Sequence, residues 1–143
     1  MDNISRFQKT TGVGQILDES FARCPEREAI VFGDWRITYR ELQALIYRTA
    51  HCLRSLGIAP GDRVAIIANN SVEFALTVYA AYGLGGVVVP MYEVQKIQDW
   101  EFIFGDSQPP LAVVSNDSIR EKIEGLNCPS LKKIYTTHPS TIA

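Results

Sequence analysis

Residues 57–92 read GIAPGDRVAIIANNSVEFALTVYAAYGLGGVVVPMY, and this stretch decides the fold. It opens with a short apolar run at 63–68 that is rich in β-branched residues, as expected of a strand buried on both faces. Ser71 is placed to cap a helix over 72–84, and a second buried strand follows at 87–89. Parallel strands need such a crossover, which is nearly always right-handed. The stretch therefore predicts one strand–helix–strand unit.

The same stretch carries its own stop signals. Gly57 can supply the left-handed residue that ends the helix before it, and Gly83, Gly85 and Gly86 can end the helix within it. Pro90 is expected to stop the second strand, because proline has no backbone N–H to give to a sheet. These residues predict where the elements of the unit end.

Before this unit, the sequence predicts a helix, a small β-hairpin and a second helix. In chain order these are a helix over 14–23, strands over 29–32 and 35–37, and a helix over 39–56. Gly33-Asp34 is a two-residue hairpin turn signal. Thr38 and Glu41 form a capping box, in which each side chain accepts from an unpaired backbone N–H at the helix start.

After this unit, helical and strand patterns alternate to the end of the chain. They are a helix over 97–104 that ends at Gly105-Asp106, a strand over 111–114, a helix over 119–126 that Asn116 or Ser118 caps, and a strand over 133–136. This alternation predicts an α/β fold with a mainly parallel sheet flanked by helices, next to the small N-terminal β-hairpin. We expect residues 1–143 to form a single α/β domain or subdomain, with residues 1–13 flexible.

The composition excludes several classes of protein. With a net charge of −2 and no basic stripe, nucleic acid is not an expected partner. Three cysteines without a CxxC pair argue against a disulfide framework or a zinc site, and the polar N-terminus lacks a signal peptide, so we expect a cytoplasmic protein. The uncharged stretch 74–92 is divided by glycines into a helix and a strand that are each too short to span a bilayer. Membrane contact is therefore expected to be peripheral at most.

Candidate site residues lie where the predicted strands end, because open parallel sheets bind ligands beyond the carboxyl ends of their strands. Asn69, Asn70 and Tyr92 occupy these positions and are our candidate substrate-binding residues. The competing interpretation is that such residues only cap helices and turn the chain, which favours the same residue types. The two histidines, His51 and His138, have no partners at a spacing that suggests a triad or a metal site, so we assign no catalytic residue and no metal ligand.

Four segments together resemble the N-terminal region of the adenylate-forming enzymes, which include acyl-CoA synthetases, luciferases and peptide-synthetase adenylation domains. The segments are ITYREL at 37–42, LGIAPGDRVAI at 56–66, NNSVEF at 69–74 and GVVVPMY at 86–92. The resemblance runs in register from Leu17 to Val114. Residues 90–93 and the helix around 100–103 are most similar to long-chain fatty acid–CoA ligases.

The resemblance implies a two-step reaction. A carboxylate attacks the α-phosphorus of ATP to give an acyl-adenylate and pyrophosphate, magnesium offsets the phosphate charge, and the coenzyme A thiol then attacks the adenylate. The Ser/Thr/Gly-rich phosphate loop with its terminal lysine, which the family uses for ATP, is absent from these 143 residues. ATP, magnesium and coenzyme A are thus implied for a full-length enzyme, and no cofactor is expected on this chain alone.

We therefore interpret the chain as the first subdomain of a larger fatty acid–CoA ligase, inactive by itself, whose principal partner is the remainder of that enzyme. Exposed apolar surface on such a fragment is expected to cause self-association. Two alternatives remain open. One is a stand-alone α/β module that binds a small ligand or regulates a partner, and the other is an enzyme that adenylates amino acids or aryl acids.

Overall fold

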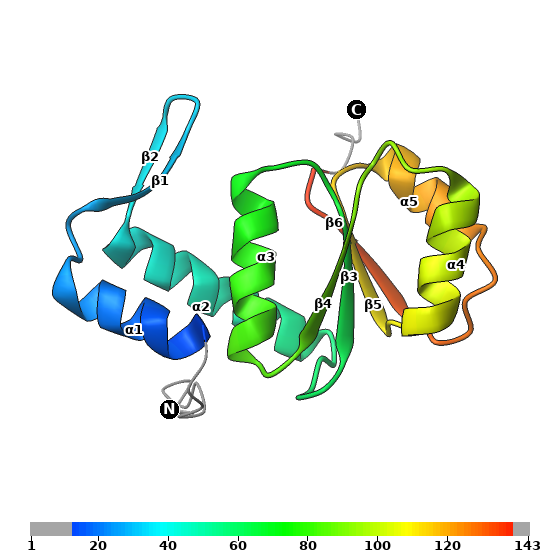
Figure 1. The fold of residues 1–143 in the computed structure, drawn as a ribbon, viewed down its shortest axis with the longest axis horizontal. Helices are drawn as coiled ribbons and strands as arrows, with labels where there is room; N and C mark the ends of the chain where they lie inside the picture. The colour runs from blue at the N-terminus through cyan, green and yellow to red at the C-terminus, as the bar shows by residue number, and fades with distance from the viewer. Residues whose placement is uncertain (1–12, 139–143) are drawn as a thin grey trace.

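The computed structural model describes residues 13–138, which form a three-layer α/β unit with a hairpin and a helix beside it (Figure 1). Four parallel strands make the central sheet in the order β4-β3-β5-β6. Their bounds are β3 Arg63–Ile67, β4 Val87–Met91, β5 Leu111–Val114 and β6 Lys133–Thr136. The mainly parallel α/β fold expected from the sequence is thus confirmed.

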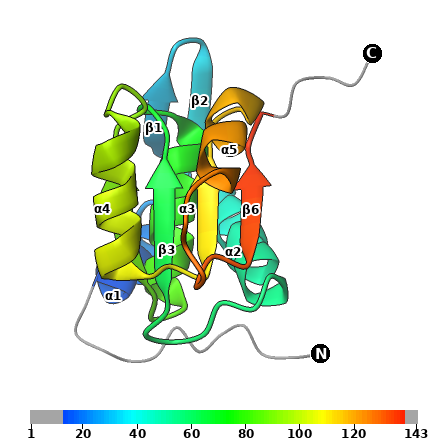
Figure 2. The ribbon, with the colours of Figure 1, turned by 90° about the vertical axis from the view of Figure 1, so that its right-hand side faces the viewer.

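Helices cover both faces of this sheet, as Figure 2 shows when the molecule is turned by 90°. One face carries α2 (Tyr39–Ser55) and α3 (Val72–Gly83), and the other carries α4 (Ile97–Ser107) and α5 (Asp117–Glu124). The central strand β3 supplies both cores, because alternate side chains of a strand point to opposite faces.

The two cores are built from alternate residues of the same strands. Val64 and Ile66 of β3 pack under α2 and α3, and Ala65 and Ile67 pack under α4 and α5. All four side chains are fully buried. The expectation that 63–68 is a strand buried on both faces is therefore confirmed.

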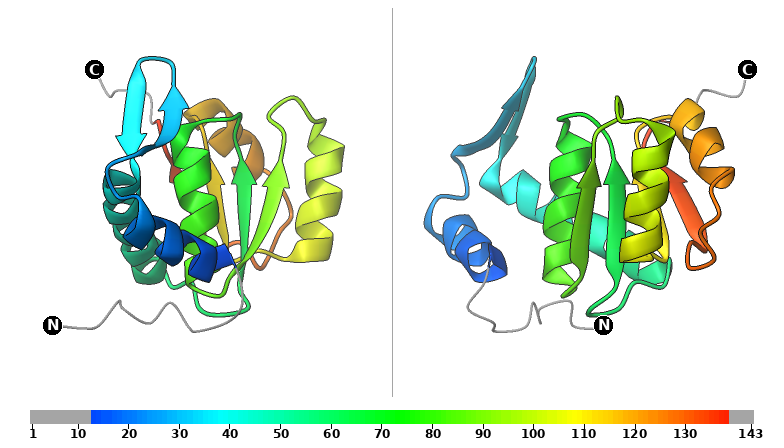
Figure 3. Two further views of the ribbon diagram at one scale, coloured as in Figure 1. Left: turned by 60° about the vertical axis from the view of Figure 1, so that its left-hand side comes forward. Right: turned by 45° about the vertical axis from the view of Figure 1, so that its right-hand side comes forward.

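The N-terminal part forms a satellite of the three-layer unit. It consists of α1 (Val13–Arg23) and the antiparallel hairpin of β1 (Glu28–Phe32) and β2 (Trp35–Thr38). Figure 3 shows the hairpin projecting away from the central sheet. Gly33 turns the hairpin with a φ of 58°, which confirms the two-residue turn at Gly33-Asp34. Residues 1–12 lie outside the described residues, and Val13 is already the first residue of α1.

The predicted helix caps are present. Ser71 Oγ accepts a hydrogen bond from the Phe74 N–H at 3.1 Å, and Asn116, one of the two predicted alternatives, caps α5. Thr38 and Glu41 form the predicted capping box at the start of α2. Gly57, with a φ of 99°, follows the end of α2 as expected. Short polar signals of this kind are local, which is why the sequence predicts them correctly.

The end of β4 differs from the prediction. The strand continues through Pro90 to Met91, whereas the sequence predicted that Pro90 would end it. Val87 is 49% exposed and Pro90 is exposed, so β4 is not a buried strand. The physical reason is that β4 lies at the edge of the sheet, where a proline can occupy a position whose N–H would have no partner strand.

The end of α4 also differs. Gly105 and Asp106 lie inside the helix, which continues to Ser107. Gln108 ends it with a left-handed φ of 47°, and Pro109 follows. Gly105 lowers the stability of the helix but does not end it. Pro109 prevents the helix from continuing, because proline cannot occupy the interior of a helix without breaking it.

The buried faces of α1 and α2 do not include every apolar residue that lies at helical spacing. In α2 the fully buried residues include Ala50, while Thr49 and Leu56 are only half-buried. In α1, Phe21 is buried but Ile16 is 66% exposed. Spacing alone does not say how far each helix is rotated toward its neighbours.

The last helix, α5, is shifted two residues toward the N-terminus from its predicted range, because Asn116 caps it.

Candidate functional site

A pocket of about 550 Å³ lies beyond the carboxyl ends of β3 and β4. The three residues that the sequence predicted for a binding site, Asn69, Asn70 and Tyr92, all line it. The other lining residues are Ala68, Phe74, Pro90 and Met91. The structure therefore brings the three candidate side chains together from two separate loops.

Hydrogen bonds hold these two loops together. The backbone N–H of Asn69 donates to Oε1 of Glu93 at 2.9 Å, which ties the loop after β3 to the loop after β4. The N–H of Tyr92 donates to Oε1 of Gln95 at 2.8 Å, and its carbonyl accepts from the indole N–H of Trp100 at 3.2 Å. Because Trp100 is fully buried, it anchors the Tyr92 backbone to the core under α4.

The pocket is neutral and partly apolar. Its seven described lining residues include two carboxamides, which both donate and accept hydrogen bonds, and no charged side chain. Tyr92 is 72% exposed and lies at the rim. The aromatic and thioether surfaces of Phe74 and Met91 supply apolar contacts. This lining can hold an uncharged group that combines hydrogen-bonding atoms with apolar surface.

Other polar residues at the strand ends serve as helix caps. Ser71 and Asn116 are occupied in capping α3 and α5, so their side-chain oxygens already accept backbone N–H groups. Asn69 is tied through its backbone, which leaves its carboxamide as a lining group of the pocket. The sequence did not identify Phe74 and Met91 as lining residues. Phe74 lies in the first turn of α3, directly after the loop that follows β3, and Met91 is the last residue of β4.

Two carboxyl groups have shifted pKa values, and both lie away from the pocket. The backbone N–H and the hydroxyl of Thr38 hydrogen-bond to Oε2 of Glu41 at 2.8 and 2.9 Å and hold the pKa of Glu41 below its ordinary value. Burial raises the pKa of Asp18 on α1. These shifts belong to helix structure and do not mark a catalytic group.

The resemblance implies magnesium for a longer enzyme. Among residues 13–138, no group of three or more His, Cys, Asp or Glu side chains is placed to hold a metal ion. His51 is exposed on α2, and His138 approaches Glu73 of α3 at 3.7 Å between Nε2 and Oε2. Within the same range, no helix has the length and apolar character that crossing a bilayer requires.

A family model described as AMP-binding enzyme matches residues 17–141, which is most of the chain. The chain belongs to the AMP-binding enzyme family. This confirms the resemblance to adenylate-forming enzymes that the four sequence segments indicated.

Relatives of this AMP-binding chain include two kinds of protein. A long-chain-fatty-acid–CoA ligase of Mycobacterium tuberculosis, FadD13, is 40% identical over 97 residues, which cover 66% of this chain and 19% of that protein. A mycosubtilin synthase subunit of Bacillus subtilis is 32% identical over 118 residues, which cover 80% of this chain and 4% of that protein. The chain thus spans less than a fifth of the length of either relative.

Among solved structures, the N-terminal domain of FACL13 from Mycobacterium tuberculosis has a TM-score of 0.82 with this AMP-binding chain at 30% identity. The similarity covers 90% of this chain and 34% of that domain. The expected fold, that of a first subdomain of such an N-terminal domain, is therefore confirmed.

Proposed function

We propose that the chain is the N-terminal portion of a fatty acid–CoA ligase. The longer enzyme would activate a fatty acid with ATP to an acyl-adenylate and then transfer the acyl group to coenzyme A. The observation that carries this proposal is the 40% identity to a long-chain-fatty-acid–CoA ligase, together with the match to the FACL13 domain. ATP, magnesium and coenzyme A are requirements of the longer enzyme in this proposal.

In this proposal, residues 1–143 supply a scaffold and one wall of the substrate site. β3 leads out of the packed core, and hydrogen bonds of Asn69 with Glu93 and of Tyr92 with Gln95 and Trp100 hold the loop after β4 beside it. Asn69, Asn70 and Tyr92 would then contact an uncharged part of the substrate or product, since the pocket has no charged lining among the described residues. The groups that bind phosphate would come from polypeptide outside this chain.

The activity test uses the longer protein and measures carboxylate-dependent exchange of pyrophosphate into ATP. We expect exchange with fatty acids and none with amino acids or aryl acids. Exchange that depends only on amino acids or aryl acids would replace this proposal with the second candidate, which the match to a mycosubtilin synthase subunit supports. Absence of exchange with every acid would contradict both.

The pocket residues give a separate prediction. In the longer protein, Asn70→Ala and Tyr92→Ala should raise KM for one substrate with little change in kcat, because they would remove contacts made equally in the ground state and the transition state. Asn127→Ala is the matched control, since Asn127 is exposed and does not line the pocket. Unchanged KM values in both pocket variants for acid, ATP and coenzyme A would show that the pocket is not part of the substrate site.

A stand-alone binding module is the third candidate, in which the 550 Å³ pocket beyond β3 and β4 would hold a small ligand without further polypeptide. Calorimetry of the 143-residue chain with ATP, coenzyme A and fatty acids separates this candidate from the first. Tight binding by the chain alone would favour a module, and we expect no binding.

A further inference from the structure

The central sheet has two edges, and their backbones differ. β4 and β6 each pair with one strand only, so each presents a row of outward-facing backbone groups. In a parallel ladder, alternate residues direct both their N–H and their C=O to the neighbouring strand, and the residues between them direct these groups outward. The backbone hydrogen bonds of each edge strand therefore identify which groups lack a strand partner.

The β4 edge is blocked by a proline. The N–H of Val87 donates to the carbonyl of Asp62 at 2.8 Å, so Val87 and every second residue after it point inward to β3. Val88 and Pro90 are the outward-pointing residues of β4. Because Pro90 has no N–H, the edge has lost one of its two outward donors, and natural proteins use this device to prevent strand addition.

The β6 edge keeps its donors. The N–H of Lys133 donates to the carbonyl of Pro110 at 3.3 Å, and that of Thr137 donates to the carbonyl of Val114 at 2.9 Å. The same alternation then points the N–H and C=O groups of Ile134 and Thr136 outward. Both outward donors of this edge strand are therefore present, and such a row of unpaired N–H and C=O groups can pair with a further strand.

Hollows flank β6 on both faces of the sheet, and they differ in character. A mainly apolar hollow of about 280 Å³ separates Tyr135 from Cys52 and Leu53 of α2. The hollow on the opposite face is lined by Ile123 and Ile134 together with charged side chains of α5 and of the segment before β6. Leu56 lines both hollows, so they meet around the edge. Figure 2 shows α2 reaching beyond β6 at the lower right of the view. The helix layer is thus wider than the sheet that it covers on this side.

We propose that the β6 edge binds one further β-strand, which the rest of the longer enzyme contributes from outside residues 1–143. This inference rests on the proposed function, because the added strand would come from the longer enzyme. The FACL13 N-terminal domain supports that source. The similarity covers only 34% of that domain, so a comparable enzyme has further polypeptide that can pack against this chain. A single strand fits better than a second copy, because α2 reaches beyond β6 on one face and limits the room for another folded unit at this edge. The added strand pairs with Ile134 and Thr136 and covers Tyr135.

Hydrogen exchange measured by NMR tests the pairing. In the 143-residue chain, the amides of Ile134 and Thr136 should exchange much faster than that of Tyr135. In the longer protein, the same two amides should be protected by about 100-fold or more, and Val88 at the β4 edge should not gain protection. The inference is overturned if Ile134 and Thr136 exchange equally fast in both proteins, or if Val88 gains the protection instead.

Matched lysine variants test the covering of the edge. Tyr135 is 46% exposed on β6 and Val87 is 49% exposed on β4, so Tyr135→Lys and Val87→Lys alter two equally exposed edge residues. Both should leave the Tm of the 143-residue chain nearly unchanged. In the longer protein, Tyr135→Lys should lower Tm by about 5 °C or more, with a smaller effect of Val87→Lys. Equal shifts, or a larger shift for Val87→Lys, would contradict the proposal.

The outcomes separate this inference from the proposed function. A longer protein that exchanges pyrophosphate with fatty acids but leaves Ile134 and Thr136 unprotected refutes the added strand alone. A longer protein that protects these amides but shows no exchange with any acid refutes the proposed function alone. Protection that appears only as the concentration of the 143-residue chain rises identifies a second copy as the occupant and overturns the proposed source.

Discussion

At the scale of single residues, the most predictable features are those that one or two side chains decide. The capping box of Thr38 and Glu41, the cap at Ser71 and the turn at Gly33 all follow from local hydrogen bonding or from glycine's access to positive φ. Asn69 was predicted as a site residue from its place after a strand, and its carboxamide lines the pocket. The partner of its backbone, Glu93, lies 24 residues away, and no local pattern could have identified it.

The capping box gives a pH-dependent prediction. Because the folded-state pKa of Glu41 is lowered, its contribution to stability is present above its unfolded pKa and is lost as pH falls through the folded value. The free energy of unfolding of the wild type should therefore exceed that of Glu41→Gln by more at pH 7 than at pH 3, as measured by urea unfolding. A difference that stays constant between these two pH values would contradict the role assigned to the carboxylate.

Thr38 tests the other half of the capping box. Thr38→Ala should lower the free energy of unfolding by about 1 kcal/mol, because the N–H of Glu41 loses its acceptor. Thr38→Ser is the control, since it keeps the hydroxyl and should cost much less. An equal loss for both variants would show that the methyl group, and not the cap, stabilises the helix.

At the scale of elements, the kind of each helix and strand was predictable, but two ends were not. Pro90 and Gly105 are both stop signals in isolation. Pro90 is tolerated because its strand is at a sheet edge, and Gly105 is tolerated because Trp100 and Phe104 pack α4 onto the core. Strand order and helix packing depend on contacts far apart in the sequence, so a local pattern cannot supply them.

Gly105 provides a direct test of the helix end. Gly105→Ala should raise the free energy of unfolding by about 0.5–1 kcal/mol, because the residue is helical and an added methyl group meets no atom within 4 Å. Gly85→Ala should lower it, since Gly85 has a φ of 74° and its added methyl group would lie 3.3 Å from Cβ of Pro60. Destabilisation by Gly105→Ala in urea unfolding would place the end of α4 at Gly105.

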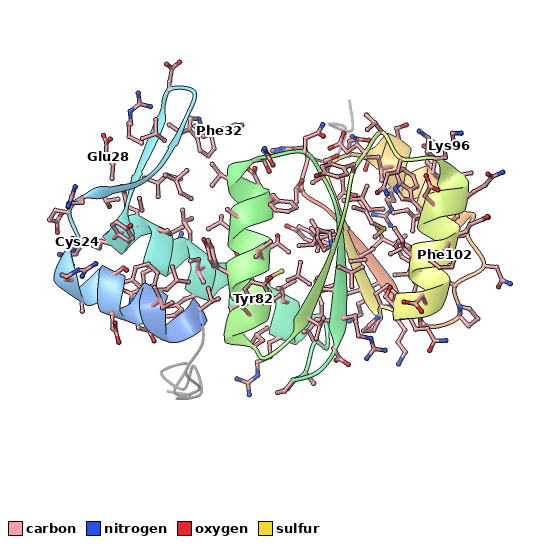
Figure 4. The ribbon with its side chains drawn as sticks, in the orientation of Figure 1. Cys24, Glu28, Phe32, Tyr82, Lys96 and Phe102 are labelled. Carbon is pink, nitrogen blue, oxygen red and sulfur yellow. The ribbon has the colours of Figure 1, made fainter. Side chains whose placement is uncertain are left out.

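At the scale of the whole molecule, the central sheet is well packed, but several large apolar side chains on the surface around it are exposed. Figure 4 shows Phe32 on the hairpin and Phe102 on α4 at opposite ends of the molecule, and both side chains are exposed. Trp35, Val87 and Tyr135 are further large apolar residues with high exposure. The alternating pattern of helices and strands predicted the layers, but nothing in it predicted which surfaces would remain uncovered.

These surfaces lead us to expect self-association of the 143-residue chain, because exposed apolar residues favour contacts that remove them from water. Light scattering at increasing concentration should give a mass that rises above 16.0 kDa. Trp35→Lys and Phe102→Lys should reduce this rise, because both side chains are exposed and lie away from the β6 edge, whereas Arg54→Lys on the polar face of α2 should not. A constant monomer mass at high concentration would contradict the expectation.

The central claim is that this AMP-binding chain builds a scaffold and a neutral pocket, while the groups that handle the nucleotide lie elsewhere in a longer enzyme. Pyrophosphate exchange into ATP, measured side by side for the 143-residue chain and the longer protein with a fatty acid present, tests it most directly. We expect exchange by the longer protein and none by the chain alone. Fatty-acid-dependent exchange by the 143-residue chain alone would contradict the claim.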